Sequence, residues 1–354
     1  MIARVATAID QPGAIVVTGA NGFLAQHCIN SLLKHGYHVV GTVRDDRKGV
    51  QTRATHENHP HLTPVVIDDI TDTVAVRETL ISFQPEAVFH LAAPFNYAAT
   101  NFETELMIPA TEGTRAVLSA AESIPSIRRI VLTSSFGSIF DAKAGPCPEK
   151  VYTAKDWSPL EYEDGVKADN VAEAYRASKV ASERIAWDFV KERKPSFDLV
   201  SLCPAMVFGA FLPHSLPNTI DELNTSNSLI WRAIKRGQGG IIPPTRGPVW
   251  VDVRDVALAH IKALKVPAAG GRRFLIAAGV YCNQELADLS RERLPALSDK
   301  IAQGKPGTRE HHTHFRVDAS ATEQVLGLKW RELGDCLAEV VPQLFAIERS
   351  AQLP

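Results

Sequence analysis

The fold is decided by the stretch Ile15-Val16-Val17-Thr18-Gly19-Ala20-Asn21-Gly22-Phe23-Leu24-Ala25. An apolar run of strand length ends at Thr18, and a helical pattern begins near Gly22. Between them, the spacing G-x-x-G-x-x-A puts Gly19 in a tight turn and lets the backbone at Gly22 approach a pyrophosphate. The N–H groups and dipole of the following helix would hold that group, although a plain strand-to-helix turn is the alternative. We expect contacts with a nucleotide from Gly19, Asn21, Gly22, Phe23 and Leu24.

Strand and helix patterns alternate over most of the chain. Strand-like runs occupy residues 15–18, 39–43, 65–67, 87–91, 130–133, 198–202 and 273–276, and helical patterns occupy 22–34, 73–83, 103–123 and 170–194. Apolar strands separated by helices predict a parallel sheet that is covered on both faces. The sequence therefore predicts an α/β, Rossmann-type doubly wound sheet of about seven strands.

A change in composition after residue 207 predicts a second, smaller unit. Proline clusters appear at Pro213, Pro217, Pro243, Pro244 and Pro248, and they mark irregular segments. We expect a nucleotide-binding domain over 12–207 plus about 250–280. A C-terminal substrate lobe would comprise about 208–249 plus 281–354.

Charge and cysteine content exclude several classes of protein. The 354 residues include 38 Lys and Arg against 40 Asp and Glu, a net charge of −2, which argues against nucleic acid or an anionic membrane as partner. No uncharged apolar run is long enough to span a bilayer. The 5 scattered cysteines predict free thiols in a cytoplasmic protein, and the cluster His311, His312 and His314 fits no standard metal site.

The end of the second strand predicts the cofactor. Arg44 follows the apolar run, with Lys48 close by, and a guanidinium can bind a 2′-phosphate. This favours NADP(H), although Asp45 could instead bind the ribose hydroxyl of NAD. Asp69 and the neighbouring Ile70 would lie at the adenine edge, unless Asp69 is only a helix-capping acid.

Three side chains carry the predicted chemistry. Tyr175 and Lys179 lie four residues apart in a helical pattern and so share one face. An ammonium group near a phenol stabilises the phenolate and adapts it to proton transfer at neutral pH. Ser134 and Ser135 follow the fifth strand, where a serine can donate a hydrogen bond to a carbonyl oxygen. A chance surface pair and a strand-capping turn are the alternatives.

These motifs resemble the extended short-chain dehydrogenase/reductases. More narrowly, the segments 42–45, 90–94, 175–179 and 252–256 are similar to the dihydroflavonol reductase-like branch, which includes cinnamoyl-CoA reductases and fungal NADPH-dependent aldehyde and ketone reductases. The similarity covers essentially the whole chain. It implies an NADP-dependent oxidoreductase that reduces a small-molecule aldehyde or ketone to the alcohol, as a monomer or homodimer.

The resemblance also implies roles for single residues. Tyr175 would be the general acid, Lys179 its partner and a ribose ligand, and Ser135 the group that polarises the carbonyl. Further cofactor contacts would come from Leu91, Ala92, Ala93, Pro204 and Val207. Many members of the superfamily carry an asparagine for a proton relay near the place of Ala110, so that relay is in doubt here.

Aromatic residues near the predicted strand ends could form an apolar substrate pocket. The candidates are Phe95, Tyr97, Phe136 and Phe208, and the alternative for each is a place in the core of the lobe. Two rival functions are a nucleotide-sugar epimerase or dehydratase of the same fold, and a non-catalytic NADP-sensing regulator. Phe136-Gly137 after Ser135 argues against a dehydratase, and the intact Tyr175/Lys179 pair argues against a regulator.

Overall fold

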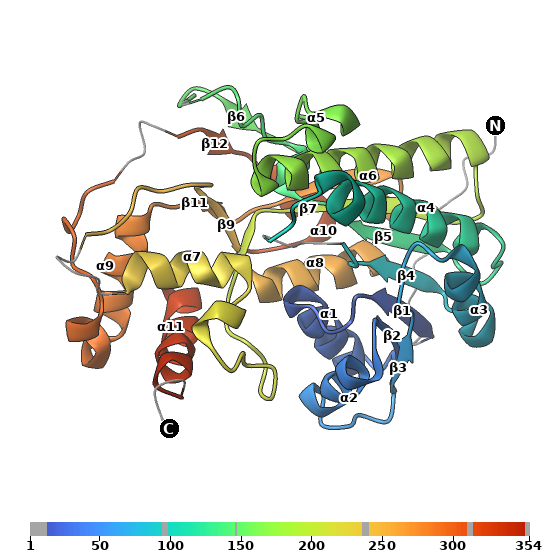
Figure 1. Ribbon diagram of the computed structural model, residues 1–354, viewed down its shortest axis with the longest axis horizontal. Helices are drawn as coiled ribbons and strands as arrows, with labels where there is room; N and C mark the ends of the chain where they lie inside the picture. Colours follow the sequence, from blue (N-terminus) through green and yellow to red (C-terminus); the bar gives the residue numbers. More distant parts are fainter. Residues whose placement is uncertain (1–12, 94–97, 146, 236–240, 310–313, 351–354) are drawn as a thin grey trace.

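A parallel sheet of seven strands forms the centre of the molecule. The computed structural model describes residues 13–93, 98–145, 147–235, 241–309 and 314–350. The strand order is β10-β7-β5-β4-β1-β2-β3, and every neighbouring pair is parallel (Figure 1). The strands are β1 (Ala14–Thr18), β2 (His38–Val43), β3 (Leu62–Val66), β4 (Ala87–His90), β5 (Arg129–Thr133), β7 (Asp198–Pro204) and β10 (Arg272–Ile276). The predicted Rossmann-type fold is confirmed.

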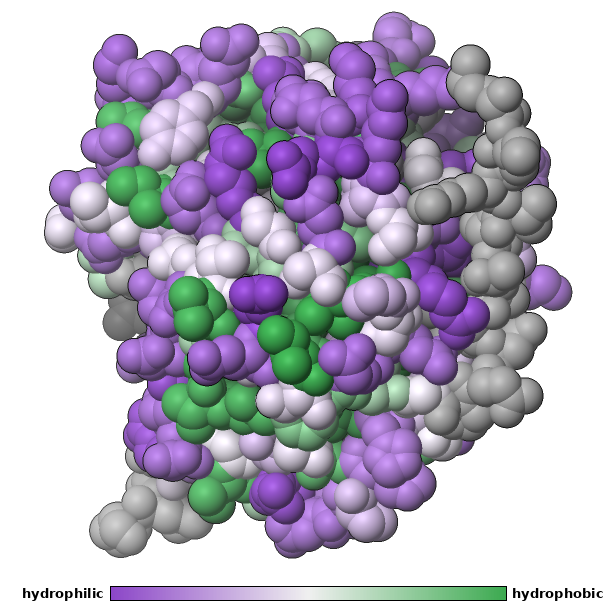
Figure 2. All heavy atoms as spheres, turned by 90° about the vertical axis from the view of Figure 1, so that its right-hand side faces the viewer, coloured by the Kyte–Doolittle hydropathy of each residue, from purple (hydrophilic) through white to green (hydrophobic). Residues whose placement is uncertain are grey.

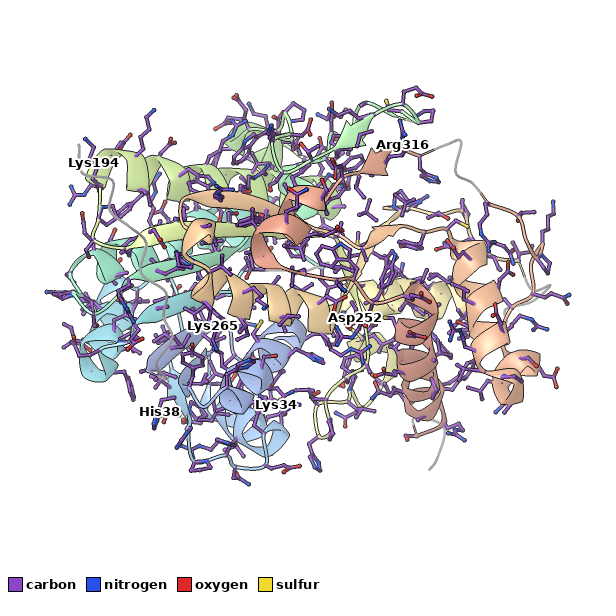
Figure 3. The ribbon with its side chains drawn as sticks, turned by 180° about the vertical axis from the view of Figure 1, so that it is seen from behind. Lys34, His38, Lys194, Asp252, Lys265 and Arg316 are labelled. Atoms are coloured by element: carbon purple, nitrogen blue, oxygen red, sulfur yellow. The ribbon has the colours of Figure 1, made fainter. Side chains whose placement is uncertain are left out.

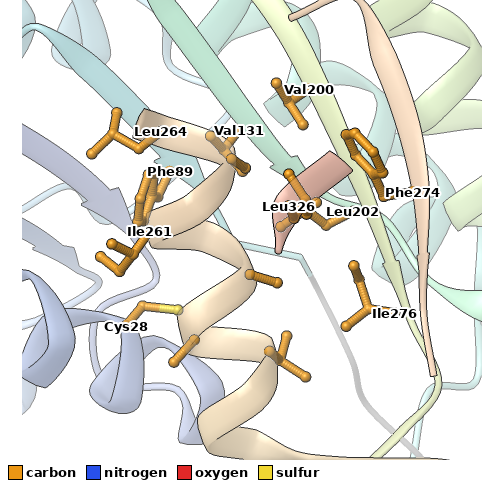
Figure 4. Close-up of a cluster of buried hydrophobic side chains, with 14 of the residues drawn as sticks. Cys28, Phe89, Val131, Val200, Leu202, Ile261, Leu264, Phe274, Ile276 and Leu326 are labelled. Atoms are coloured by element: carbon orange, nitrogen blue, oxygen red, sulfur yellow. The ribbon is translucent and has the colours of Figure 1, made fainter. Parts of the chain in front are cut away.

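Helices cover both faces of this sheet because side chains alternate along each buried strand. Ile15 and Val17 of β1 point into one hydrophobic cluster, which α1 (Phe23–Lys34) and α8 (Val253–Lys265) close. Figure 4 shows part of that cluster, with Phe89, Val131 and Ile261 between α8 and the strands. Val16 points into the opposite cluster, under α3 (Thr73–Phe83), α4 (Ile108–Glu122) and α6 (Val171–Arg193).

The strand order reverses at β1, which has β2 on one side and β4 on the other. Chain connections leave β1 and β4 in opposite directions, so a crevice opens beyond their carboxyl ends. The glycine turn and the ends of β2, β4, β5 and β7 therefore meet around one place.

A third cluster of buried side chains lies beside the main sheet. It joins α7 (Thr225–Ile234), α9 (Asn283–Arg293) and α11 (Leu333–Ser350) to a small sheet of β8 (Met206–Phe208), β9 (Val249–Asp252) and β11 (Gly279–Val280). In Figure 1 these elements lie together on the left of the molecule. Figure 3 labels Asp252, where β9 passes into α8, and Lys265 at the far end of that helix.

The shorter elements complete the layers. They are α2 (Asp46–Thr55), β6 (Val151–Tyr152) paired with β12 (Arg316–Val317), α5 (Tyr162–Val166), α10 (Ser320–Leu326), a π-helical turn η1 (Glu103–Met107), and the 3₁₀ turns η2 (Phe136–Ser138), η3 (Ile220–Glu222), η5 (Pro267–Ala269) and η6 (Pro295–Lys300). Phe315, Leu326 and Leu328 pack into the first hydrophobic cluster, although the sequence boundary places them in the lobe.

The surface over the α3 side of the molecule is mixed in character. Figure 2 shows hydrophilic residues around smaller groups of apolar ones on that face. None of the helices in the described part of the chain combines the length and apolar character that crossing a membrane requires.

Candidate active site

The glycine turn packs directly onto the end of β4. Gly19 has φ +69°, a conformation that favours glycine, and a Cβ atom there would lie 3.1 Å from the Ala92 Cα atom. The N–H groups of Leu91 and Ala92 donate to the Thr18 hydroxyl at 3.1 and 2.9 Å. The turn and the predicted cofactor contacts on β4 are thereby joined into one rigid cradle.

The first turn of α1 is left open for an anion. Gly22 is the N-cap of α1, and no side chain hydrogen-bonds to the helix end there. The orphan N–H groups of a helix N-terminus bind phosphate well. Asn21 and Leu24 are half-buried beside this end, whereas the Phe23 ring packs edge-on against Phe211 at 5.1 Å.

The two residues that follow β2, Arg44 and Asp45, make different contacts. Asp45 is the N-cap of α2: it accepts a 2.9 Å hydrogen bond from the Lys48 N–H, and its other oxygen lies 3.6 Å from the Lys48 ammonium. Arg44 is exposed, and no ion pair ties it to the described residues. Asp45 is therefore occupied by the helix start, while the Arg44 guanidinium is available for a 2′-phosphate.

The loop after β3 is shaped by its own polar contacts. The exposed Asp69 accepts hydrogen bonds from the N–H and the hydroxyl of Thr71, both at 2.8 Å, and Asp72 caps α3. Ile70 packs against Gly113 of α4, where a Cβ atom would lie 2.9 Å from the Ile70 Cγ2 atom. The helix-capping alternative for Asp69 is thus filled by Asp72, and the role of Asp69 at the adenine edge stays a prediction.

Lys179 connects α6 to the end of β5. Its Nζ donates a 3.1 Å hydrogen bond to the Thr133 carbonyl oxygen, and its side chain is buried. Burial lowers the pKa of Lys179 to about 8, although the negative charge of Glu183 acts in the opposite direction. Tyr175 is half-buried one turn earlier on the same helix.

The two serines after β5 have different surroundings. Ser134 is buried, and its hydroxyl donates a 2.6 Å hydrogen bond to the Glu183 carboxylate. The Ser135 hydroxyl accepts a 3.0 Å hydrogen bond from the Gly137 N–H as the N-cap of η2. No described residue accepts the Ser135 hydroxyl proton, so that proton is available for a ligand.

A buried chain of polar groups runs behind the cradle. The Thr18 hydroxyl lies 2.9 Å from His90 Nδ1, and the Thr114 hydroxyl lies 3.4 Å from His90 Nε2 and 2.9 Å from the Ser182 hydroxyl. Burial lowers the pKa of His90 to about 3, so this imidazole is neutral at physiological pH. Ala110, one turn before Thr114 on α4, is buried and carries no polar side-chain atom that could take the place of the relay asparagine.

The predicted nicotinamide contacts follow the sixth strand of the main sheet. Pro204 is buried at the end of β7, opposite Ile276 of β10. Val207 is half-buried on β8 and lies opposite Val251 of β9. Both positions border the carboxyl edge of the sheet, and their contact with a cofactor stays a prediction.

The four aromatic residues expected at the substrate pocket differ in where the structure places them. Phe95 and Tyr97 lie outside the described residues. Phe208 is fully buried, with its ring 5.1 Å from that of Tyr281 and 6.3 Å from that of Trp250, which is the lobe-core alternative. Phe136 is 9% exposed and belongs to an aromatic cluster with Phe140, Tyr152 and Phe315.

An apolar hollow borders this aromatic cluster. It has a volume of about 250 Å³ and is lined by Pro148, Pro248, Val280, Tyr281, Cys282, His314, Phe315 and Arg316. The buried Tyr281 hydroxyl has no hydrogen-bond partner among the described residues. No local sequence pattern indicates this hollow, because its walls come from four separate stretches of the chain.

Buried Glu183 and Arg273 are the residues at this site that sequence reasoning missed. Their side chains meet at 2.7 Å although 90 residues separate them in the sequence. Because the two residues are so far apart in the sequence, no local pattern indicates that they meet, and only the folded structure shows this contact. Among the described residues, no group of three or more His, Cys, Asp or Glu side chains could hold a metal ion.

Comparison with known proteins places this geometry among reductases. The model of the NAD dependent epimerase/dehydratase family matches residues 15–277. The chain is 33% identical over 335 residues to the ketoreductase azaE of Aspergillus niger, covering 93% of this chain and 97% of the relative. It is 30% identical over 344 residues to the NADPH-dependent methylglyoxal reductase GRE2 of Saccharomyces cerevisiae, covering 95% and 99%.

Solved structures agree with these relatives. The yeast methylglyoxal/isovaleraldehyde reductase Gre2 complexed with NADPH superposes with a TM-score of 0.87 at 29% identity, over 95% of this chain and 99% of that one. Gre2 from Candida albicans in complex with NADPH gives a TM-score of 0.86 at 31% identity, with the same coverage. The resemblance to fungal reductases that the motifs indicated is confirmed.

Proposed function

The chain belongs to the NAD dependent epimerase/dehydratase family, and on that premise we propose that it is an NADPH-dependent reductase that converts an aldehyde or a ketone to the alcohol. Its relatives GRE2 of Saccharomyces cerevisiae and azaE of Aspergillus niger carry the names of a methylglyoxal reductase and a ketoreductase. The substrate is a small-molecule carbonyl compound, and the reaction consumes NADPH.

One observation carries the proposal: Lys179 of α6 hydrogen-bonds to the last residue of β5, Thr133, directly before the two serines. The helix with the Tyr175/Lys179 pair and the strand end with Ser135 thus meet at the same point. An acid for the proton and a donor for the oxygen need this proximity, because both act on a single carbonyl group.

The cradle fits the pyrophosphate and adenosine parts of NADPH. A side chain at Gly19 would fill the space against Ala92, and the uncapped first turn of α1 offers N–H donors. Arg44 would hold the 2′-phosphate, since Asp45 is engaged by Lys48. When bound, NADPH supplies the hydride.

The side chains of the chain itself manage the proton and the charge. Tyr175 donates its phenolic proton to the carbonyl oxygen, and Ser135 donates a hydrogen bond to the same atom. Lys179, as an ammonium, stabilises the phenolate that remains and binds the ribose. The hydrogen bonds to the oxygen make the carbonyl carbon more electrophilic, and the proton from Tyr175 completes the alcohol product.

The direct test is a panel of aldehydes and ketones incubated with NADPH and followed at the absorbance of the cofactor. We expect oxidation of NADPH with at least one class of carbonyl, and a much slower reaction with NADH. Absence of turnover over the whole panel, with NADPH bound, would favour the regulator.

The surroundings of the enzyme form part of the proposal. All 5 cysteines are free thiols, which suits the reducing cytoplasm. We propose that the protein works there as a monomer or homodimer, which light scattering after size exclusion measures. Nucleic acid and membranes are not expected as partners.

A further inference from the structure

A buried carboxylate lies one helical turn beyond Lys179, and the proposed reaction does not use it. Glu183 on α6 is fully buried. It accepts hydrogen bonds from the hydroxyls of Ser134, Ser138 and Ser201 at 2.6, 2.7 and 2.6 Å. A buried polar group that is satisfied in this way fixes the conformation of the segments that supply its partners.

Arg273 of β10 completes the cluster as the counter-ion. Its Nε and Nη2 atoms donate to the two Glu183 oxygens at 2.7 and 3.1 Å. The same guanidinium donates to the carbonyl oxygens of Ser138 and Ala154, and lies 3.9 Å from the centre of the Trp157 ring. The planar donor fork thus ties η2 and the loop before α5 to β10.

Glu183 and Lys179 hold neighbouring residues of the same strand end. Lys179 donates to the Thr133 carbonyl oxygen, and Glu183 accepts from the Ser134 hydroxyl. Because successive side chains alternate in direction along an extended chain, fixing Ser134 inward turns Ser135 the other way. The Ser135 backbone is extended, with φ −159° and ψ 153°, as this alternation requires.

Glu183 also has an electrostatic relationship with Lys179. Burial raises the pKa of Glu183, but the hydrogen bonds from Arg273, Ser134 and Ser201, together with the charge of Arg273, lower it below its usual range, so this carboxylate is ionised. Among the described residues, Cys203 of β7 interacts with both groups and His90 of β4 interacts with Lys179. Glu183 is the buried anion nearest to the ammonium in sequence, one turn along the same helix.

We propose that Glu183, held by Arg273, is a positioning residue for carbonyl reduction. It fixes the turn after β5 so that Ser135, and not Ser134, faces the crevice, and it supplies a permanent negative charge one turn from Lys179. The inference rests on the proposed function, because it concerns how the reducing residues are held.

The test compares Glu183, which accepts hydrogen bonds from Ser134 after β5 and from Ser201 of β7, with an ion pair at the opposite end of β5 and β7. Glu183→Gln removes the charge at the carboxyl end of β5 and β7. Asp198→Asn removes the partner of the buried Arg129 at the opposite end of these strands, where the two side chains meet at 2.6 Å. Both changes should lower the stability of the fold, so stability alone does not distinguish a positioning role from a structural one.

The distinguishing measurements are pH profiles of NADPH binding and of turnover. Without the negative charge of Glu183, the Lys179 ammonium should deprotonate at a lower pH. The pH at which the affinity for NADPH falls on the alkaline side should therefore decrease by on the order of one unit. Turnover at pH 7 should fall by on the order of 10- to 100-fold, as a misplaced catalytic group predicts. In Asp198→Asn, both profiles should coincide with those of the natural protein.

A second variant covers the case in which Glu183→Gln does not fold. Glu183→Gln combined with Arg273→Met leaves no unpaired buried charge. Its profile should be displaced in the same direction but by less, because the Arg273 cation is removed together with the Glu183 anion. Coincidence of the NADPH-binding profile with that of the natural protein in a folded Glu183 variant would overturn the inference. This measurement needs no carbonyl substrate, whereas the failure of the proposed function would appear as lack of turnover in the unaltered protein.

Discussion

The hydroxyl of Ser134 donates a 2.6 Å hydrogen bond to the buried carboxylate of Glu183, while the neighbouring Ser135 hydroxyl only accepts a bond from the Gly137 N–H. A serine that is committed to an internal anion cannot also donate to a substrate. The structure therefore supports Ser135 as the residue that polarises the carbonyl.

Exchanging each serine for alanine separates the two roles. Ser135→Ala should lower kcat by on the order of 10² to 10³, because a donor aimed at the developing negative charge is lost. Ser134→Ala should lower the free energy of unfolding by about 1–3 kcal/mol, because Glu183 loses a buried donor. Steady-state kinetics and urea unfolding of both variants give the comparison. A larger loss of kcat in Ser134→Ala would reverse the assignment.

Tyr175→Phe removes only a hydroxyl group and tests proton transfer. Turnover should fall by at least about 10²-fold, as expected for losing a general acid, while NADPH affinity should be largely kept. Tyr162→Phe, on the neighbouring α5, is the matched control and should leave turnover unchanged. Near-normal kcat in Tyr175→Phe would remove this residue from the chemistry.

Arg44→Asp tests the choice of cofactor. The loss of the guanidinium should weaken the binding of NADPH. The preference for NADPH over NADH should fall by on the order of 10-fold or more, which corresponds to roughly 1.4 kcal/mol for each factor of ten. Arg53→Asp makes the same change of charge in the last turn of α2 and should not alter the preference. Kinetics with both cofactors provide the measurement. If the unaltered protein used NADPH and NADH equally well, Arg44 would have no selective role.

The buried ammonium of Lys179 predicts a pH dependence of stability. Its pKa is lowered from 10.5 to about 8, so between these values the folded protein holds fewer protons at this site than the unfolded chain does. The contribution of the group to stability therefore rises as the pH increases from about 8 to 10.5.

Lys179→Met should remove this rise. The free energy of unfolding of the variant, minus that of the natural protein, should be largest below pH 8 and should shrink towards pH 10.5. Lys191→Met, at an exposed position of the same α6, should show a difference that is nearly independent of pH over this range. A constant difference for Lys179→Met would contradict the lowered pKa.

Local patterns explain which parts of the structure the sequence could predict. The strands and the turn at Gly19 are determined by residues that are adjacent in the sequence. The alternation of the strands with helices then predicts the parallel sheet. The helix α2 was missed because it buries only Gly49, Thr52 and Thr55 and so has no apolar stripe. The helix expected over 103–123 begins instead with the π-helical η1, next to Pro109, which has no N–H to donate.

The limits at the site have a different cause. Tyr175, Lys179 and the serines form short motifs, so their type and spacing could be read directly. The link between Glu183 and Arg273 depends on the register of β10 against β7, which no local pattern contains. Phe208 could be equally well a pocket residue or a core residue by sequence, and the packing around Trp250 places it in the core.

The division of labour between Arg44 and Asp45 has a consequence for redesign. Under the proposed function, residue 44 selects the coenzyme and residue 45 starts α2. These two traits could be altered independently, since the Arg44 side chain is exposed and Asp45 accepts the hydrogen bond from the Lys48 N–H. A change of coenzyme from the phosphorylated to the plain dinucleotide can therefore be sought by varying residue 44 alone. An acid introduced at residue 44 would supply the ribose ligand. Asp45 cannot provide that ligand without losing its hydrogen bond from the Lys48 N–H at the start of α2.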